Sequence, residues 1–154
     1  MDSSGEVHEC WEELLTVKGD WTPAVLQLYD EEGLFENDIM FIQTIELDDA
    51  YRGKGIGARA VLETIATFGS SCALVACKPF PLQYTNWMDD EYKAIREAPG
   101  FEKKRRAEFG KVEKFWRGLG FNKLPNSDFF TYAPQLREQP SRINIAPKTR
   151  AATS

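Results

Sequence analysis

Near the start of the chain, apolar residues recur at the spacing of an amphipathic helix. One side of such a helix would carry Val7, Trp11, Leu14 and Leu15. We therefore predict a short helix over residues 7–15 that stops before Gly19. The next apolar segment, residues 25–29, is too short to assign from its periodicity.

The middle of the chain reads as a strand, a glycine-rich loop, a helix and a second strand. Residues 39–47 are rich in β-branched and aromatic side chains and alternate after Phe41, which predicts a strand. Residues 56–68 follow a helical pattern. Their apolar face would consist of Ile56, Ala60, Val61, Ile65 and Phe68. Residues 72–78 are almost continuously apolar, as in a strand buried on both faces, so a β-α-β unit is expected.

The second half of the chain contains one strongly amphipathic helix. Residues 79–87 read as a loop and 89–97 as a short helix. Residues 101–119 place apolar side chains on one side of a helix and basic side chains on the other. The basic face would carry Lys103, Lys104, Arg105, Arg106, Lys111, Lys114 and Arg117. A last strand is predicted at 129–132, and the polar, proline-containing residues 134–154 are expected to form a disordered tail.

Composition fits one compact domain over residues 1–133, followed by the tail at 134–154. The chain has 154 residues, of which 42% are hydrophobic and 28% charged. Its longest apolar run, residues 72–77, is far shorter than the roughly 20 residues of a membrane helix, so no membrane association is expected. The acidic N-terminus does not resemble a secretory signal, and we expect a cytoplasmic protein.

Charge is divided unevenly along the chain. Residues 1–50 contain 14 Asp and Glu but a single Lys, a formal charge of -13, whereas residues 51–154 carry +8. The acidic half suits a cationic partner, although the two halves would also satisfy each other by contact or simply face water. The net charge of -5 argues against nucleic-acid binding, for which the basic helix would be the only candidate.

Cysteine and histidine give no sign of a metal site. Cys10, Cys72, Cys77 and the single His8 lack the spacing of zinc ligands, and three cysteines cannot all pair. We expect reduced thiols and no bound metal.

The glycine loop carries the clearest chemical signal. Glycines at 53, 55 and 57 lie between a predicted strand and a predicted helix, where the unpaired amides of the helix start favour a phosphate. Arg52 and Lys54 add positive charge at the same place. The loop does not fit the P-loop pattern, because Gly follows Lys54 where Ser or Thr is needed. A dinucleotide-binding motif is disfavoured because the following strand ends in Lys78 instead of an acidic residue.

Two segments of the sequence resemble the GNAT family of acetyl-CoA-dependent N-acetyltransferases. Residues 52–57, Arg-Gly-Lys-Gly-Ile-Gly, are similar to the family's Arg/Gln-x-x-Gly-x-Gly/Ala loop between a strand and a helix. Residues 115–121, Phe-Trp-Arg-Gly-Leu-Gly-Phe, resemble the family's aromatic-Tyr-x-x-Leu-Gly-Phe segment. The two landmarks occur in the family's order and frame residues 39–133.

The resemblance implies an α/β fold with a mixed, splayed β-sheet flanked by helices, and acetyl-CoA as co-substrate. The pantetheine arm would lie between the strands at 39–47 and 72–78. Its partners would be the backbone groups of Ile45, Glu46 and Leu47, and the pyrophosphate would meet the amides of Arg52, Gly53, Lys54, Gly55, Ile56, Gly57 and Ala58. The acceptor would be an amine on a small molecule or a protein, attacking the thioester directly, so no nucleophilic residue is required.

Two features bear on catalysis. Trp116 stands where the family commonly has the tyrosine that protonates the leaving thiolate, and we interpret it as a packing residue. Glu46 is a candidate general base, with a solvent-facing carboxylate as the alternative. Other proton-active side chains that could lie near the cleft are Tyr84, Tyr132 and Cys77.

The N-terminal half is shorter than is usual in the family, with only about 38 residues before the strand at 39–47. The acceptor site would then be built differently, or completed in a homodimer or larger assembly. The alternative to an enzyme is a catalytically silent acyl-CoA-binding or interaction module with the same fold.

Overall fold

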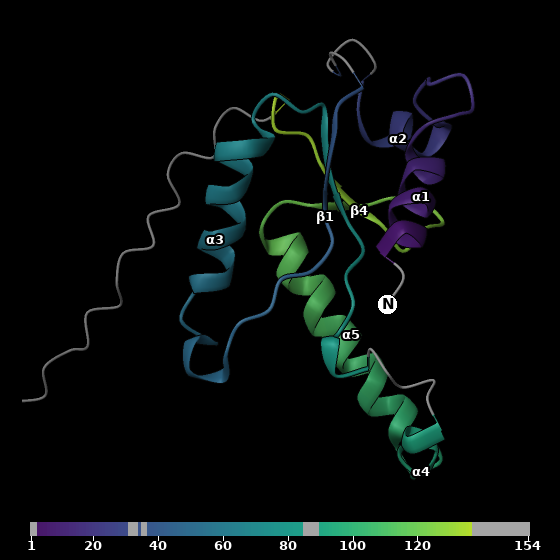
Figure 1. Ribbon diagram of the computed structural model, residues 1–154, viewed down its shortest axis with the longest axis vertical. Helices are drawn as coiled ribbons and strands as arrows, with labels where there is room; N and C mark the ends of the chain where they lie inside the picture. Colours follow the sequence, from purple (N-terminus) through teal and green to yellow (C-terminus); the bar gives the residue numbers. More distant parts are fainter. Residues whose placement is uncertain (1–2, 31–33, 35–36, 85–89, 137–154) are drawn as a thin grey trace, which may run out of the picture.

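The computed structural model describes residues 3–30, 34, 37–84 and 90–136. Its helices are α1 (Ser3–Leu14), α2 (Pro23–Leu28), α3 (Ile56–Thr64), α4 (Lys93–Arg96) and α5 (Phe101–Gly118). Its strands are β1 (Ile39–Ile42), β2 (Leu74–Cys77), β3 (Asn122–Lys123) and β4 (Phe130–Tyr132). The chain is thus a mixed α/β domain (Figure 1).

The strands form one mixed sheet in the order β1-β2-β4-β3. β1 and β2 are parallel, with Ile39 opposite Leu74 and Ile42 opposite Cys77, and α3 provides the crossover between them. β4 is antiparallel to both β2 and β3. The predicted β-α-β unit is therefore confirmed, and β2 is an inner strand, as its apolar sequence predicts.

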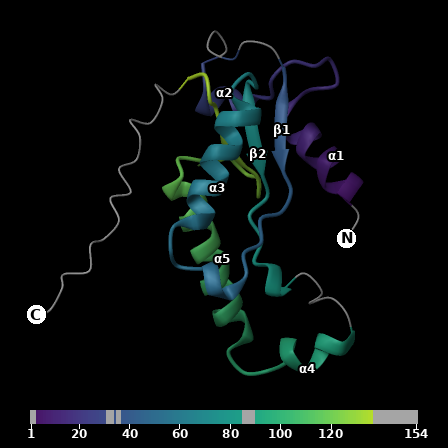
Figure 2. The same cartoon turned by 60° about the vertical axis from the view of Figure 1, so that its left-hand side comes forward.

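Helices cover both faces of the sheet, with α1 and α2 on one side and α3 and α5 on the other (Figure 2). Alternate residues of β2 supply the two cores. Leu74 and Ala76 belong to the core that contains Val25 of α2, whereas Val75 and Cys77 belong to the core beneath α3 and α5. All four β2 residues are buried, so this strand connects the two halves of the hydrophobic interior.

The first strand is shorter than predicted, ending at Ile42 instead of Leu47. Its only neighbour within the described sheet is β2, which ends at Cys77, one residue before the Lys78–Pro79 pair. Proline has no N–H to donate to a ladder, which favours an end of the pairing at this point. Within the described residues, 43–47 consequently have no strand partner although their sequence alternates.

Helix predictions differ in accuracy with helix length. The predicted helix at 101–119 is α5, and the one at 7–15 is α1, which begins earlier, at Ser3. The predicted helix at 56–68 is α3 followed by a wider π-type turn at Ile65–Gly69. The short helix α2, with Pro23 at its first position, and the two-residue strand β3 were not predicted from the sequence.

Two predicted segments lie partly outside the described residues. Within the expected helix at 89–97, a single 3-10 turn (Asp90–Tyr92) leads into α4, and residue 89 is not described. In the expected tail, residues 134–136 form a turn, where Gln135 Nε2 donates a hydrogen bond of 3.0 Å to the carbonyl of Ser71. The prediction of disorder for the remaining 137–154 lies outside the described residues. Among the helices that are described, none is long and apolar enough to cross a membrane.

Candidate functional site

The end of the β1–β2 ladder opens into a cavity of about 370 Å³. Its walls are the two chain segments that continue beyond the paired strands, residues 42–47 after β1 and residues 77–83 after β2. Arg52 and Gly57 close one end, Glu6 of α1 lies at the rim, and α5 contributes one face between residues 111 and 116. The cavity thus lies where the two parallel strands stop pairing, at their carboxyl ends.

The glycine loop adopts the conformation that its sequence requires. Gly53 and Gly55 have φ angles of 72° and 77°, in the left-handed region that side chains disfavour, and Gly55 caps α3. The amide of Arg59 donates to the Gly55 carbonyl at 3.1 Å, so regular helical bonding starts there. The amides of residues 56–58 precede that point and have no helical acceptor, which leaves them available to an anion.

Gly57 is required for a different reason, namely close packing. It is buried, and a Cβ atom at this position would lie 3.1 Å from Leu47 Cδ1 and 3.8 Å from Phe115 Cζ. Any larger residue would push Leu47 or Phe115, which both line the cavity. The start of α3 can therefore lie against the cavity wall only because this residue has no side chain.

The side chain of Arg52 contacts two nearby residues of its own chain, Leu47 and Asp49. Its Nε donates to the carbonyl oxygen of Leu47 at 2.8 Å, and its Nη1 lies 2.9 Å from Asp49 Oδ1. The side chain is 60% exposed. The guanidinium, which the sequence suggests as a phosphate ligand, thus links the glycine loop to the segment that follows β1.

The residues predicted to hold a coenzyme divide into two groups. Ile45, Glu46, Leu47, Arg52 and Gly57 line the cavity. The others lie next to it, in the loop or the first turn of α3, and comprise Gly53, Lys54, Gly55, Ile56 and Ala58. Lys54 is exposed, whereas Ala58 packs against the core beneath α3. The predicted residues are therefore brought together in one region.

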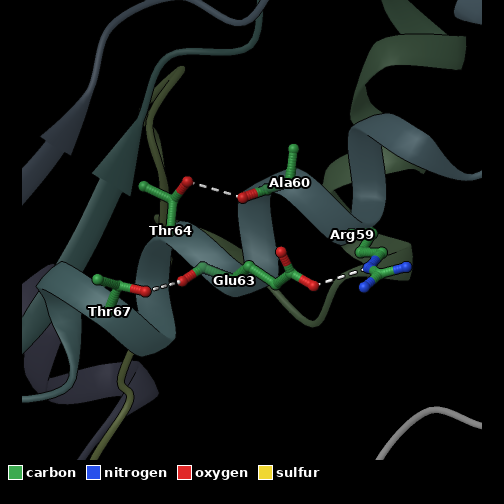
Figure 3. Close-up of polar contacts among 5 residues, drawn as sticks. All are labelled: Arg59, Ala60, Glu63, Thr64 and Thr67. Carbon is green, nitrogen blue, oxygen red and sulfur yellow. Dashed lines mark hydrogen bonds and ion pairs between the residues drawn. The ribbon is translucent and has the colours of Figure 1, made fainter.

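The outer face of α3 is occupied by its own local bonds (Figure 3). Arg59 Nε lies 2.7 Å from Glu63 Oε1, and the hydroxyls of Thr64 and Thr67 donate to the backbone carbonyls four residues earlier, at 2.7 and 2.8 Å. The hydrogen bond to Glu63 raises the pKa of Arg59, which stays charged in any case. The Arg59 charge is thus paired on the helix surface, away from the loop that precedes Gly55.

Trp116 is a packing residue, as its position in the sequence pattern suggests. It is 7% exposed, and its ring meets Phe115 and Phe121 edge to face at centroid distances of 5.5 and 4.9 Å. Phe121 in turn contacts Tyr132 at 5.3 Å. Two members of this aromatic cluster, Phe115 and Trp116 of α5, line the cavity.

The basic and acidic residues that line the cavity differ in whether they form ion pairs. Each basic lining residue has a carboxylate partner: Arg52 pairs with Asp49, Lys78 with Glu9 at 2.8 Å, and Lys111 with Glu108 at 2.8 Å. By contrast, Glu6 and Glu46 form no ion pair among the residues that the structure describes. The lining is consequently more negative than its residue types suggest.

Other proton-active side chains are less available. Cys77 lines the cavity, but burial, and then the neighbouring Cys10, raises the pKa of its thiol. Tyr84 is buried against Phe101, at 5.9 Å between ring centroids. His8 lies on the surface of α1, 3.2 Å from Glu12. Within the described residues, no three acidic, cysteine or histidine side chains are grouped to hold a metal ion.

The segment at 79–83 forms a wall of the cavity that was not predicted from the sequence. Two prolines stiffen it, Phe80 packs edge to face on Phe109 of α5 at 5.2 Å, and Gln83 Nε2 donates to Glu108 at 3.3 Å. The available signal was its position, because binding residues gather at the carboxyl ends of parallel strands.

Comparisons of this chain with models of protein families, with curated proteins and with solved structures found no match. What points to a function is the set of residues around the cavity together with the two sequence landmarks. Both landmarks border the cavity, the glycine loop through Gly57 and the aromatic segment through Phe115 and Trp116.

Proposed function

We propose that this protein is a cytoplasmic N-acetyltransferase of the GNAT type, which transfers the acetyl group of acetyl-CoA to an amine in a ternary complex. One observation carries the proposal: two parallel strands stop pairing at Ile42 and Cys77, and the cavity that opens there adjoins a glycine loop at the start of a helix. The sheet would then be the mixed, splayed sheet of that family.

The residues present fit coenzyme A. Among the described residues, no strand borders residues 43–47, so their peptide groups suit an extended pantetheine arm, although the Leu47 carbonyl already accepts a hydrogen bond from Arg52 Nε. The amides at residues 56–58, together with Lys54, suit its phosphates. A volume of about 370 Å³ lies within the usual range for small-molecule sites. When bound, acetyl-CoA supplies a thioester that a neutral amine can attack.

The chain's own contribution would be orientation and a polar environment for the developing charge. Trp116 would support the site by packing, since its indole N–H is too weak an acid to protonate a thiolate. Glu46 is exposed at the cavity wall, where its carboxylate would accept the amine's proton through water.

The unpaired carboxylates favour a cationic acceptor, such as a polyamine or a lysine side chain. Glu6 and Glu46 reach the cavity from different elements, whereas each basic lining residue is neutralised by its own partner. A protonated amine would be attracted to this rim and would lose its proton before attack.

The test is release of free thiol from acetyl-CoA over a panel of polyamine, lysine-peptide and neutral amines. Amine-dependent release is expected. Gly57→Ala should slow it, because the added methyl displaces Leu47 from the cavity wall, whereas Gly110→Ala serves as a matched control since a Cβ there meets nothing within 4 Å. Binding of coenzyme A without thiol release would establish the silent module, and absence of both would overturn the proposal.

A further inference from the structure

We propose that Arg52 acts as a positioning residue that holds the segment after β1 against the glycine loop, and is not a direct phosphate ligand. This inference rests on the proposed function for its ligand-binding part. Its structural basis is the pair of contacts from one guanidinium, Nε to the Leu47 carbonyl at 2.8 Å and Nη1 to Asp49 Oδ1 at 2.9 Å.

The two contacts span a tight turn. Residues Asp49–Tyr51 form a single 3-10 turn, in which the Tyr51 amide donates to the Asp48 carbonyl at 2.9 Å and the Arg52 amide to the Asp49 carbonyl at 3.2 Å. The Arg52 side chain returns over this turn to the Leu47 carbonyl. It therefore sets the distance between the end of the cavity wall and the start of the loop.

The position of Leu47 affects both sides of the cavity. Its Cδ1 atom lies 3.1 Å from where a Cβ of Gly57 would be, so its side chain fits against the first turn of α3. Within the described residues no strand borders residues 43–47, and the bond from Arg52 replaces the missing ladder at this end. A shift of Leu47 would change the cavity wall and the loop together.

The geometry requires an arginine. The planar guanidinium presents donors in a rigid fork, so it can bond a carbonyl and a carboxylate at once, whereas a lysine offers a point charge on a flexible stem. The positioning role thus predicts that Arg52→Lys behaves like Arg52→Gln. A direct phosphate ligand predicts that lysine retains much of the affinity.

The experiment is calorimetric titration of wild type, Arg52→Lys and Arg52→Gln with coenzyme A and with pantetheine, which lacks the phosphates. We expect both variants to weaken both ligands by a similar factor, about fivefold, the effect of one lost hydrogen bond of ordinary strength at an exposed side chain. Asp49→Asn should likewise weaken the binding of both coenzyme A and pantetheine. Loss confined to coenzyme A, or rescue by lysine, would overturn the proposal.

A second measurement requires no ligand. Hydrogen exchange of the Tyr51 and Arg52 amides, which are bonded within the turn, should quicken in both Arg52 variants. Arg59→Gln is the matched control, because it removes the same charge from a nearby arginine whose partner is Glu63 on the same helix (Figure 3). Unchanged exchange in folded Arg52 variants would refute the positioning role, whereas failure of wild type to bind either ligand would refute only the proposed function.

Discussion

At the scale of single residues, the glycine loop combines two separate constraints. Gly53 and Gly55 are needed for their backbone angles, and Gly57 for close contact with Leu47 and Phe115. The same short motif therefore shapes the turn and allows the helix to approach the cavity. Substitutions at Gly53 and Gly55 should therefore be harmful through backbone strain, and those at Gly57 through steric crowding.

Two substitutions of Gly55 test the phosphate site, because they separate the effect of an added negative charge from the effect of backbone strain. At its φ of 77°, both Asp and Asn are tolerated better than other residues, and nothing lies within 4 Å of an added Cβ. Gly55→Asp should weaken binding of coenzyme A at least about tenfold, because its carboxylate repels a phosphate at the helix start. Gly55→Asn should cost much less.

Calorimetry on the two variants, with unfolding midpoints as the control for strain, measures this difference. Equal affinity of folded Gly55→Asp and wild type would mean that no phosphate binds at this loop.

Trp116 gives a prediction about catalysis. The ring of Trp116 is buried between Phe115 and Phe121. The Trp116→Phe variant should therefore retain most of the turnover and lose only packing contacts of the indole. Trp21→Phe, in the core on the other face of the sheet, is the matched control for the loss of an indole. A drop of more than about 100-fold in a folded Trp116→Phe protein, the scale of a missing acid or base, would show a direct role in proton transfer.

At the scale of elements, the sequence predicts those helices and strands whose length is set by the local pattern of apolar residues. The helix at 101–119 is recovered nearly to its ends because its apolar stripe repeats over five turns of helix. The strand at 39–47 is overestimated because its length depends on a partner elsewhere, and pairing with β2 ends at Cys77, shortly before Pro79. The six-residue α2 is too short to show a period.

The candidate site divides in the same way. The glycine loop was predictable because the positive φ angles of Gly53 and Gly55 depend on the residue type itself and not on distant parts of the chain. In contrast, the pairing of Lys78 with Glu9 brings together residues far apart in the chain. The contact of Phe80 with Phe109 likewise depends on where α5 packs.

The junction of α1 with β2 gives a pH prediction. Burial, with help from Glu9 and Glu13, raises the pKa of Cys10 from its ordinary value of 9.0 to about 12. The folded protein holds this proton more tightly than the unfolded chain. The associated stability is therefore complete below pH 9 and is lost as the pH rises toward 12.

Urea unfolding below pH 9 and about one pH unit above it measures this loss, which should reach about 1.4 kcal/mol per pH unit for the thiol. Cys10→Ala should be less stable at neutral pH but should lose less stability between the two conditions. Parallel pH dependence in wild type and Cys10→Ala would contradict the buried-thiol explanation.

At the scale of the whole molecule, the charge division persists in the folded chain. Among the described residues, one ion pair between distant segments, Lys78 with Glu9, joins the acidic first 50 residues to the basic remainder. In the part of the chain that the structure describes, no ion pair joins the acidic first 50 residues to the basic face of α5. The proposed function assigns this acidic half to the recognition of a cationic acceptor.

The expected consequence is a salt-dependent preference for cationic amines. Attraction between exposed charges is screened over about 8 Å at physiological salt, so the apparent affinity for polyamines and lysine peptides should fall as ionic strength rises. Rates measured at low and high salt with cationic and neutral amines test this. Equal use of neutral amines without salt dependence would exclude a steering role.

The position of β1 in the sheet also has a consequence for solubility. β1 borders β2 on one side only, and in the described part of the sheet no strand follows on the other. Natural sheet edges are commonly protected by charged residues or proline, yet Ile39–Ile42 contains neither. Among the described residues no strand covers the outer peptide groups of β1, which could template strand addition, so we expect a partially unfolded chain to aggregate first at this edge.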